Sequence, residues 1–164
     1  MTKFEFHFDF GSPNAYLSHL VIPGIEERTG VKIDYTPVLL GGVFKATGNV
    51  SPAISLAGIE NKPAYQQKET ERFLKKHGIT EYAFNPNFPV NTLHIMRGAI
   101  AAQLKGVFEK YVEADYRSMC VDQQQMHDLD DILEVLNAAG LAGQTLMAHT
   151  QERHPPHAST ANPT

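Results

Sequence analysis

The first residues of the chain alternate between polar and aromatic side chains. Phenylalanine occupies every second position from Phe4 to Phe10, and the intervening positions are charged or histidine. Side chains along a β-strand point alternately to its two faces, so a period of two predicts a strand over residues 3–10 with an aromatic face packed inward. The alternation stops at Gly11, where the strand should end.

A helix is predicted to begin directly after this strand. Ser12 is a preferred N-cap residue, Pro13 is favoured at the first helical position, and apolar residues then recur at helical spacing as far as Gly30. Residues 31–38 predict a second strand. Together these elements form a βαβ unit, whose strands should be parallel and whose crossover should be right-handed.

The middle of the chain changes from glycine-rich to helical. Residues 39–62 contain four glycines and little periodicity, which predicts a long loop with one helical turn near residues 43–47. From Pro63 onward the pattern favours helices. We expect them over residues 63–76, over residues 93–111 with Ile100 and Leu104 on the buried stripe, and from Asp128 to Gly140.

Composition limits the classes of function. Lys and Arg number 14 against 18 Asp and Glu, a net charge of −4, and no basic cluster indicates nucleic-acid binding. No stretch approaches the ~20 apolar residues of a membrane span, and the N-terminus lacks a signal-peptide core. The expected location is the cytoplasm. The single cysteine, Cys120, cannot form an internal disulfide and is expected to be a buried, unreactive thiol.

Ser12 is the main candidate for chemistry, because it lies where a strand ends and a helix begins. A helix N-terminus presents unpaired amides and a partial positive charge, which favours an anion. Thioredoxin-like folds place a Cys-x-x-Cys pair at this turn, whereas this chain has Ser12, Pro13, Asn14 and Ala15. Disulfide exchange at this turn is therefore excluded. Ser12 either caps the helix only, or also donates a hydrogen bond to a sulfur that a cofactor supplies.

The segment FDFGSPNAYL resembles the N-terminal motif of 2-hydroxychromene-2-carboxylate isomerases and kappa-class glutathione transferases, which belong to the DsbA-like superfamily. Residues 38–52, 62–73 and 85–103 resemble the isomerases more closely. The resemblance implies an α/β, thioredoxin-like fold. Its first half would span residues 1–62, a large all-helical insertion residues 63–148, and a disordered tail outside the family pattern residues 149–164.

The end of the chain departs from the family pattern. In the family, a cis-proline turn, a β-hairpin and a last helix follow the helical insertion, and none of them is expected here. The sequence after Leu146 is rich in proline and histidine, which suggests truncation or an altered reading frame near residues 151–154. His149, His154 and His157 lack a carboxylate or cysteine partner set, so no metal site is expected.

The resemblance also implies an activity, a cofactor and a site. Glutathione would place its sulfur against Ser12 and the helix that begins with Pro13 and Asn14. The thiolate would add reversibly to a small aromatic carboxylate, open its chromene ring, allow rotation and leave, which gives a cis–trans isomerisation in aromatic-compound catabolism. The expected substrate-binding residues are Phe44, Lys45, Asn49 and Phe88.

Other interpretations of these residues stay open. Lys45 is equally interpretable as a surface lysine, and Asn49 as a turn residue. The chain could instead be a kappa-class-like glutathione transferase, or a DsbA-like fragment without catalysis. A homodimer is possible in any of these cases.

Overall fold

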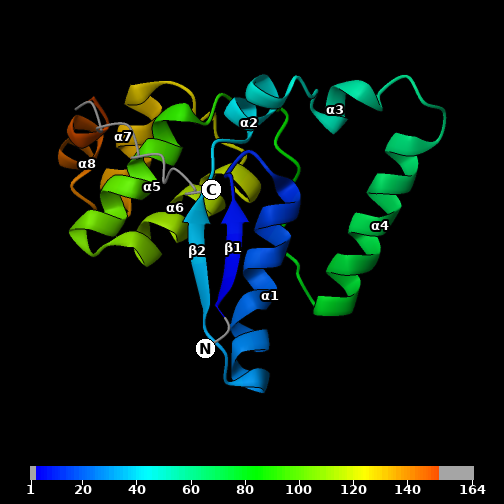
Figure 1. Ribbon diagram of the computed structural model, residues 1–164, viewed down its shortest axis with the longest axis horizontal. Coiled ribbons are helices and arrows are strands. Elements are labelled where there is room, and N and C mark those ends of the chain that lie inside the picture. The colour runs from blue at the N-terminus through cyan, green and yellow to red at the C-terminus, as the bar shows by residue number, and fades with distance from the viewer. Residues whose placement is uncertain (1–2, 152–164) are drawn as a thin grey trace, which may run out of the picture.

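A computed structural model describes residues 3–151 of the 164-residue chain. Two strands and eight helices lie within this range (Figure 1). In chain order they are β1 (Phe4–Phe8), α1 (Pro13–Thr29), β2 (Ile33–Pro37), α2 (Leu40–Thr47), α3 (Pro52–Ser55), α4 (Lys62–His77), α5 (Leu93–Lys105), α6 (Phe108–Cys120), α7 (Leu129–Ala138) and α8 (Gly143–Gln151). No helix of residues 3–151 is both long and apolar enough to cross a membrane.

The predicted βαβ unit is confirmed. β1 and β2 are parallel and pair from Phe4 opposite Ile33 to Phe8 opposite Pro37, with α1 as the crossover. Helix α1 ends at Gly30, which has the left-handed backbone (φ 68°) that favours glycine. β1 is shorter than predicted because the Asp9 carbonyl oxygen accepts the Ser12 N–H at 2.9 Å, which turns the chain away from the strand.

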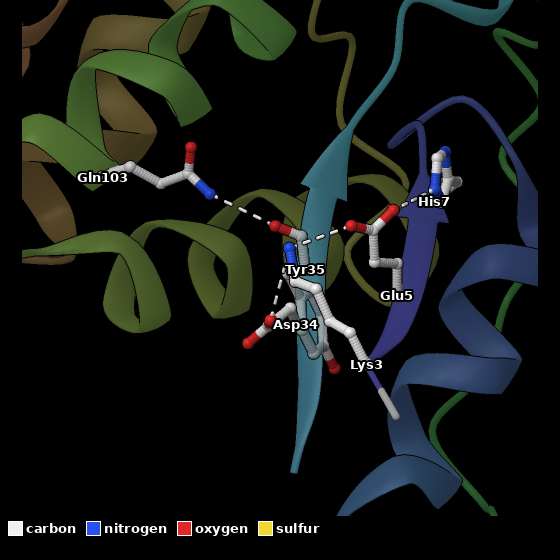
Figure 2. A network of polar contacts seen from close by, with 6 residues as sticks. All are labelled: Lys3, Glu5, His7, Asp34, Tyr35 and Gln103. Atoms are coloured by element: carbon white, nitrogen blue, oxygen red, sulfur yellow. Dashed lines mark hydrogen bonds and ion pairs between the residues drawn. The ribbon is translucent and has the colours of Figure 1, made fainter. Parts of the chain in front are cut away.

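The polar face of the sheet is exposed, as the alternation predicted. Figure 2 shows Lys3, Glu5 and His7 along β1 with Asp34 of β2 beside them. Lys3 Nζ lies 2.9 Å from a Glu5 carboxylate oxygen and 3.6 Å from one of Asp34. Exposed ion pairs are screened by solvent and contribute little to stability, so this network mainly marks the solvent face of the sheet.

The aromatic face of the sheet packs against α1 and α6. Phe8 and Phe10 are each 1% exposed, and their rings contact Tyr116 of α6 with centroids 6.1 and 4.9 Å away. Edge and tilted contacts of this kind add about 0.5–1.5 kcal/mol per pair beyond the area that they bury. The hydrophobic core therefore lies between the βαβ unit and the helices that follow it.

Helices α5 to α8 form a bundle on one side of the sheet (Figure 1). The prediction of one continuous helix over residues 93–111 was wrong, because Gly106 (φ 70°) ends α5 and α6 begins at Phe108. Placing Ile100 and Leu104 on the buried stripe was wrong as well, since they are 36% and 72% exposed. The core of α5 consists mainly of Ile95, Met96 and small residues, among them Gly98 and Ala99.

The segment 39–62 contains more helix than the single turn predicted. It forms α2, an eight-residue helix ended by Gly48 (φ 66°), and the short α3. Glycines at positions 41 and 42 lie inside α2 and do not break it. The next helix, α4, runs from Lys62 to His77 close to its predicted bounds, and it has no buried residue.

Candidate functional site

The turn between β1 and α1 places Ser12 as the N-cap of α1. Its backbone is extended (φ −104°, ψ 107°), and Pro13 occupies the first turn of the helix. The Ser12 hydroxyl oxygen accepts the Ala15 N–H at 3.3 Å, and its carbonyl oxygen accepts the N–H groups of Ala15 and Tyr16 at 3.0 and 3.2 Å. The predicted cap is confirmed, and the side chain uses its oxygen as an acceptor.

Two hydrogen-bond donors remain at this helix end. The Ser12 hydroxyl proton is free to point away from the helix, because the hydroxyl accepts the Ala15 bond through a lone pair. Pro13 has no N–H, and the Asn14 N–H has no partner among the described residues. Both donors lie where the helix dipole is positive, so the turn favours a negatively charged atom.

Asp9 is a site residue that the sequence pattern placed wrongly on the exposed face. It is 3% exposed, and its two carboxylate oxygens accept the N–H of Gly11 at 2.8 Å and the N–H of Leu40 at 2.7 Å. Asp9 thus holds the turn before Ser12 and the first residue of α2 together. An Asp two residues before a Gly is typical of an Asx-turn, which is the local signal that could have identified it.

Phe88 lies beside the same turn. A small cavity of about 10 Å³ is lined by Gly11 and Pro13 of the turn together with Phe84 and Phe88. Of the four expected substrate-binding residues, Phe88 is therefore the one that the structure brings next to the start of α1. Phe84, which shares this cavity wall, was missed by the sequence analysis.

A larger groove lies between α1 and α4. It has a volume of about 380 Å³, and its walls include Asn14 of α1 and Arg72, Phe73 and Lys76 of α4. Small-molecule sites typically have volumes of about 300–1,000 Å³. Asn14 therefore faces a hollow large enough for a small ligand, two residues after Ser12.

The remaining expected residues lie on or just after α2. Phe44 is half-buried, whereas Lys45 and Asn49 are exposed. Asn49 donates its N–H to the Phe44 carbonyl oxygen at 2.9 Å and accepts the Val50 N–H at 2.8 Å. Neither hollow described above includes these three residues in its walls. Their roles toward a substrate stay predictions.

Cys120 is buried, as expected, at the end of α6. Burial raises the pKa of its thiol to about 12, so the thiol is protonated at neutral pH. A reactive sulfur at Ser12 therefore does not come from Cys120. Of the three tail histidines, His149 lies in α8, and His154 and His157 lie outside the described residues.

Comparison with known proteins identifies the family. The sequence profile described as DSBA-like thioredoxin domain matches residues 3–157. The chain belongs to the DSBA-like thioredoxin domain family. The thioredoxin-like fold predicted from the Ser12 motif is thereby confirmed.

Two relatives of this DSBA-like chain are isomerases by name. One, a 2-hydroxychromene-2-carboxylate isomerase of Sphingobium xenophagum, is 41% identical over 80 residues, which are 48% of this chain and 40% of that protein. The matched part thus spans less than half the length of that relative. The other is the solved structure of a 2-hydroxychromene-2-carboxylate isomerase (HCCA isomerase), with a TM-score of 0.70 and 23% identity over 89% of this chain and 70% of that chain. The structural likeness shows the shared fold.

Proposed function

We propose that this DSBA-like protein is a glutathione-dependent cis–trans isomerase that acts on 2-hydroxychromene-2-carboxylate or a similar aromatic carboxylate. The observation that carries the proposal is the serine at the N-cap of α1, where disulfide oxidoreductases of this fold need a cysteine. The 41% identity to a 2-hydroxychromene-2-carboxylate isomerase supports the same reaction class.

The residues at the turn suit a glutathione thiolate. The Ser12 hydroxyl proton and the Asn14 N–H are two donors that can point at one sulfur atom, and the positive end of α1 stabilises its charge. Helix N-termini lower thiol pKa values from about 8.5 by one unit or more. Bound glutathione would supply a nucleophilic sulfur that can add to the substrate and leave again.

Ser12 acts in this proposal as a donor and not as a nucleophile. A serine nucleophile needs an adjacent base, usually histidine, within hydrogen-bond distance of its hydroxyl. Among residues 3–151 the hydroxyl has one hydrogen-bond partner, the Ala15 N–H. The Asp9 carboxylate, the nearest acid in sequence, is bonded to two backbone amides. Ser12 therefore stabilises charge on an incoming sulfur.

The substrate site is proposed from residue chemistry. Lys45 would pair with the substrate carboxylate, Asn49 would add a hydrogen bond, and Phe44 and Phe88 would contact the aromatic ring. The role belongs to aromatic-compound catabolism, and we propose the cytoplasm as its location, because the only cysteine in the chain is a free thiol.

Turnover by the purified chain tests the proposal. The chain with glutathione should convert 2-hydroxychromene-2-carboxylate to its trans isomer without net loss of thiol, and Ser12→Ala should lower kcat by a factor of about 100, the range of one lost oxyanion-hole donor. Stoichiometric thiol consumption would instead indicate a kappa-class-like transferase. Folded protein that binds no glutathione in calorimetry would mean that the chain is not this enzyme.

A further inference from the structure

The connection between α4 and α5 is fixed by hydrogen bonds even though it has no regular secondary structure over residues 80–92. Its Ala83 N–H donates to the Cys120 carbonyl oxygen at 2.7 Å. The Asn85 side chain, 7% exposed, donates to the carbonyl oxygens of Met119 and Gln124 at 3.0 and 2.8 Å. Asn85 thereby attaches this connection to the C-terminal end of α6.

The side chain of Gln123, which follows α6, also hydrogen-bonds to the connection between α4 and α5. Gln123 Nε2 donates to the Phe84 carbonyl oxygen at 2.8 Å, and the Gln123 carbonyl oxygen accepts from Asn87 Nδ2 at 3.3 Å. Gln123 itself has a left-handed backbone (φ 56°), which is uncommon outside glycine. The backbone around Phe84 is therefore held on both sides by amide side chains.

This fixed backbone presents two phenylalanine rings beside the Ser12 turn. The ring centroids of Phe84 and Phe88 are 5.6 Å apart with planes at 58°. Phe84 and Phe88 both line the small cavity that Gly11 and Pro13 of the turn also line. Phe84 is nevertheless 56% exposed, so more than half of its surface contacts nothing in the fold.

We propose that Phe84 and Phe88 form an aromatic platform that binds the ring of an aromatic carboxylate next to Ser12. The choice of this ligand class rests on the proposed function. The cavity of about 10 Å³ holds one water at most, so the ligand ring lies on the exposed outer surface of the pair. A platform whose backbone is already fixed loses little conformational entropy when a ligand binds.

Phe84 contacts the ligand in this proposal, and Asn85 and Gln123 are positioning residues. Phe88 was predicted from the sequence to contact the ring, whereas Phe84 was assigned no role. Phe44, the other expected ring contact, lies in α2 and does not border this cavity. The part of the ring site beside the Ser12 turn is therefore built by the connection between α4 and α5, and Phe44 would contact the ring from elsewhere.

Binding of coumarin-3-carboxylate, a stable fluorescent bicyclic carboxylate, tests the platform without requiring turnover. The chain has no tryptophan, so the ligand fluorescence can be followed against a low protein background. Phe84→Ala should raise the Kd about three- to tenfold, the range for one lost aromatic contact, and Phe84→Leu should give a smaller rise. The matched control is Phe4→Ala, because Phe4 of β1 is 50% exposed, and this variant should leave the Kd unchanged.

An equal Kd for Phe84→Ala and Phe4→Ala would overturn the platform. So would a Phe84→Ala variant that binds the ligand normally but changes the oligomeric state in sedimentation, because the pair would then cover a second copy. Absence of turnover with Phe84-dependent binding would reject the proposed isomerase and keep the platform. Turnover with a KM unaffected by Phe84→Ala would reject the platform alone.

Discussion

A carboxylate oxygen of Asp9 accepts the backbone N–H of Leu40 at 2.7 Å, across 31 positions of sequence. Leu40 is the first residue of α2, and Leu39 before it has no side-chain cap. Asp9 thus caps α2 from a distance and places a negative charge at its N-terminus, where the helix dipole favours one. The turn before Ser12 and the start of α2 are held by one side chain.

Replacing this side chain should destabilise the protein strongly. Asp9→Ala leaves the N–H groups of Gly11 and Leu40 without their acceptor, and we expect a loss of about 2–4 kcal/mol in the free energy of unfolding. Urea denaturation measures it. Asp34→Ala is the control, since the one ion pair of Asp34 among residues 3–151 is the exposed contact with Lys3 at 3.6 Å, and its loss should change stability far less. Equal losses in the free energy of unfolding for the two substitutions would show that Asp9 does not stabilise the fold by capping α2.

His19 makes stability depend on pH. Its Nδ1 lies 2.7 Å from the Tyr35 hydroxyl and its Nε2 lies 3.6 Å from a Glu113 carboxylate oxygen. Burial lowers the pKa of His19 below its ordinary value, although Glu113 opposes the shift. The unfolded chain therefore binds a proton that the folded chain does not, and stability should fall as the pH drops below about 6.5.

Urea titrations between pH 5 and 8 test this dependence. His19→Gln should flatten the decrease in stability below pH 6.5, and Tyr35→Phe should lower stability mainly at higher pH, where the neutral ring loses its hydroxyl partner. A His19→Gln variant with the same pH dependence as the natural chain would show that His19 is not the group responsible.

Asp115 is a buried acid whose carboxylate makes no hydrogen bond among residues 3–151. It lies in α6, where it is fully buried. Tyr111, one turn earlier, donates its hydroxyl proton to the Ile95 carbonyl oxygen at 2.9 Å. Burial raises the pKa of Asp115 well above its ordinary value, although the nearby Tyr111 hydroxyl opposes the shift, so the folded chain keeps a proton that the unfolded chain releases.

This raised pKa lowers stability as the pH rises from about 4, the value for an unfolded aspartate, up to the folded pKa. Asp115→Asn removes this titratable group. We expect the change in the free energy of unfolding that it causes to be more favourable at pH 8 than at pH 4 by at least about 1 kcal/mol. Calorimetric melting at both pH values measures the difference. If Asp115→Asn instead lowered the free energy of unfolding more at pH 8 than at pH 4, Asp115 would be ionised in the folded chain.

Gly98 allows α5 and α6 to approach closely. A Cβ at this position would lie 2.1 Å from the Tyr111 hydroxyl oxygen and 2.6 Å from Met147 Cε. Gly98→Ala should therefore destabilise the protein by about 1–3 kcal/mol, as overpacked cores do. Gly41→Ala, in α2 with nothing within 4 Å, should be neutral or stabilising by up to about 1 kcal/mol. A neutral Gly98→Ala in chemical denaturation would refute the close packing.

The βαβ unit could be predicted because its signals are local. Aromatic alternation defines β1, Ser12 and Pro13 define the start of α1, and Gly30 defines its end. These features depend on neighbours within a few positions. The prediction that Ser12 caps α1 was correct for the same reason.

The features that were missed depend on contacts distant in sequence. Asp9 looks like a residue of the polar face until Leu40 supplies its partner. The break between α5 and α6 was hidden because Val107 and Phe108 continue the apolar pattern past Gly106. Phe84 looks like an ordinary loop residue, since its exposed position depends on hydrogen bonds that join residues 84 and 85 to Gln123 and Gln124, 39 positions later.

The proposed function requires that Ser12 and the start of α1 stabilise a thiolate. A pH titration of the ultraviolet absorbance of glutathione, bound by excess protein, measures this directly. The Cys120 thiol does not contribute to the signal, because burial raises its pKa to about 12. We predict that the pKa of the bound thiol lies at least about one unit below 8.5 and that Ser12→Ala raises it toward 8.5. Ser18→Ala is the control and should leave this pKa unchanged, because the Ser18 hydroxyl donates to the Asn14 carbonyl oxygen. A bound-thiol pKa equal to that of free glutathione, or one that Ser12→Ala leaves unchanged, would contradict the account.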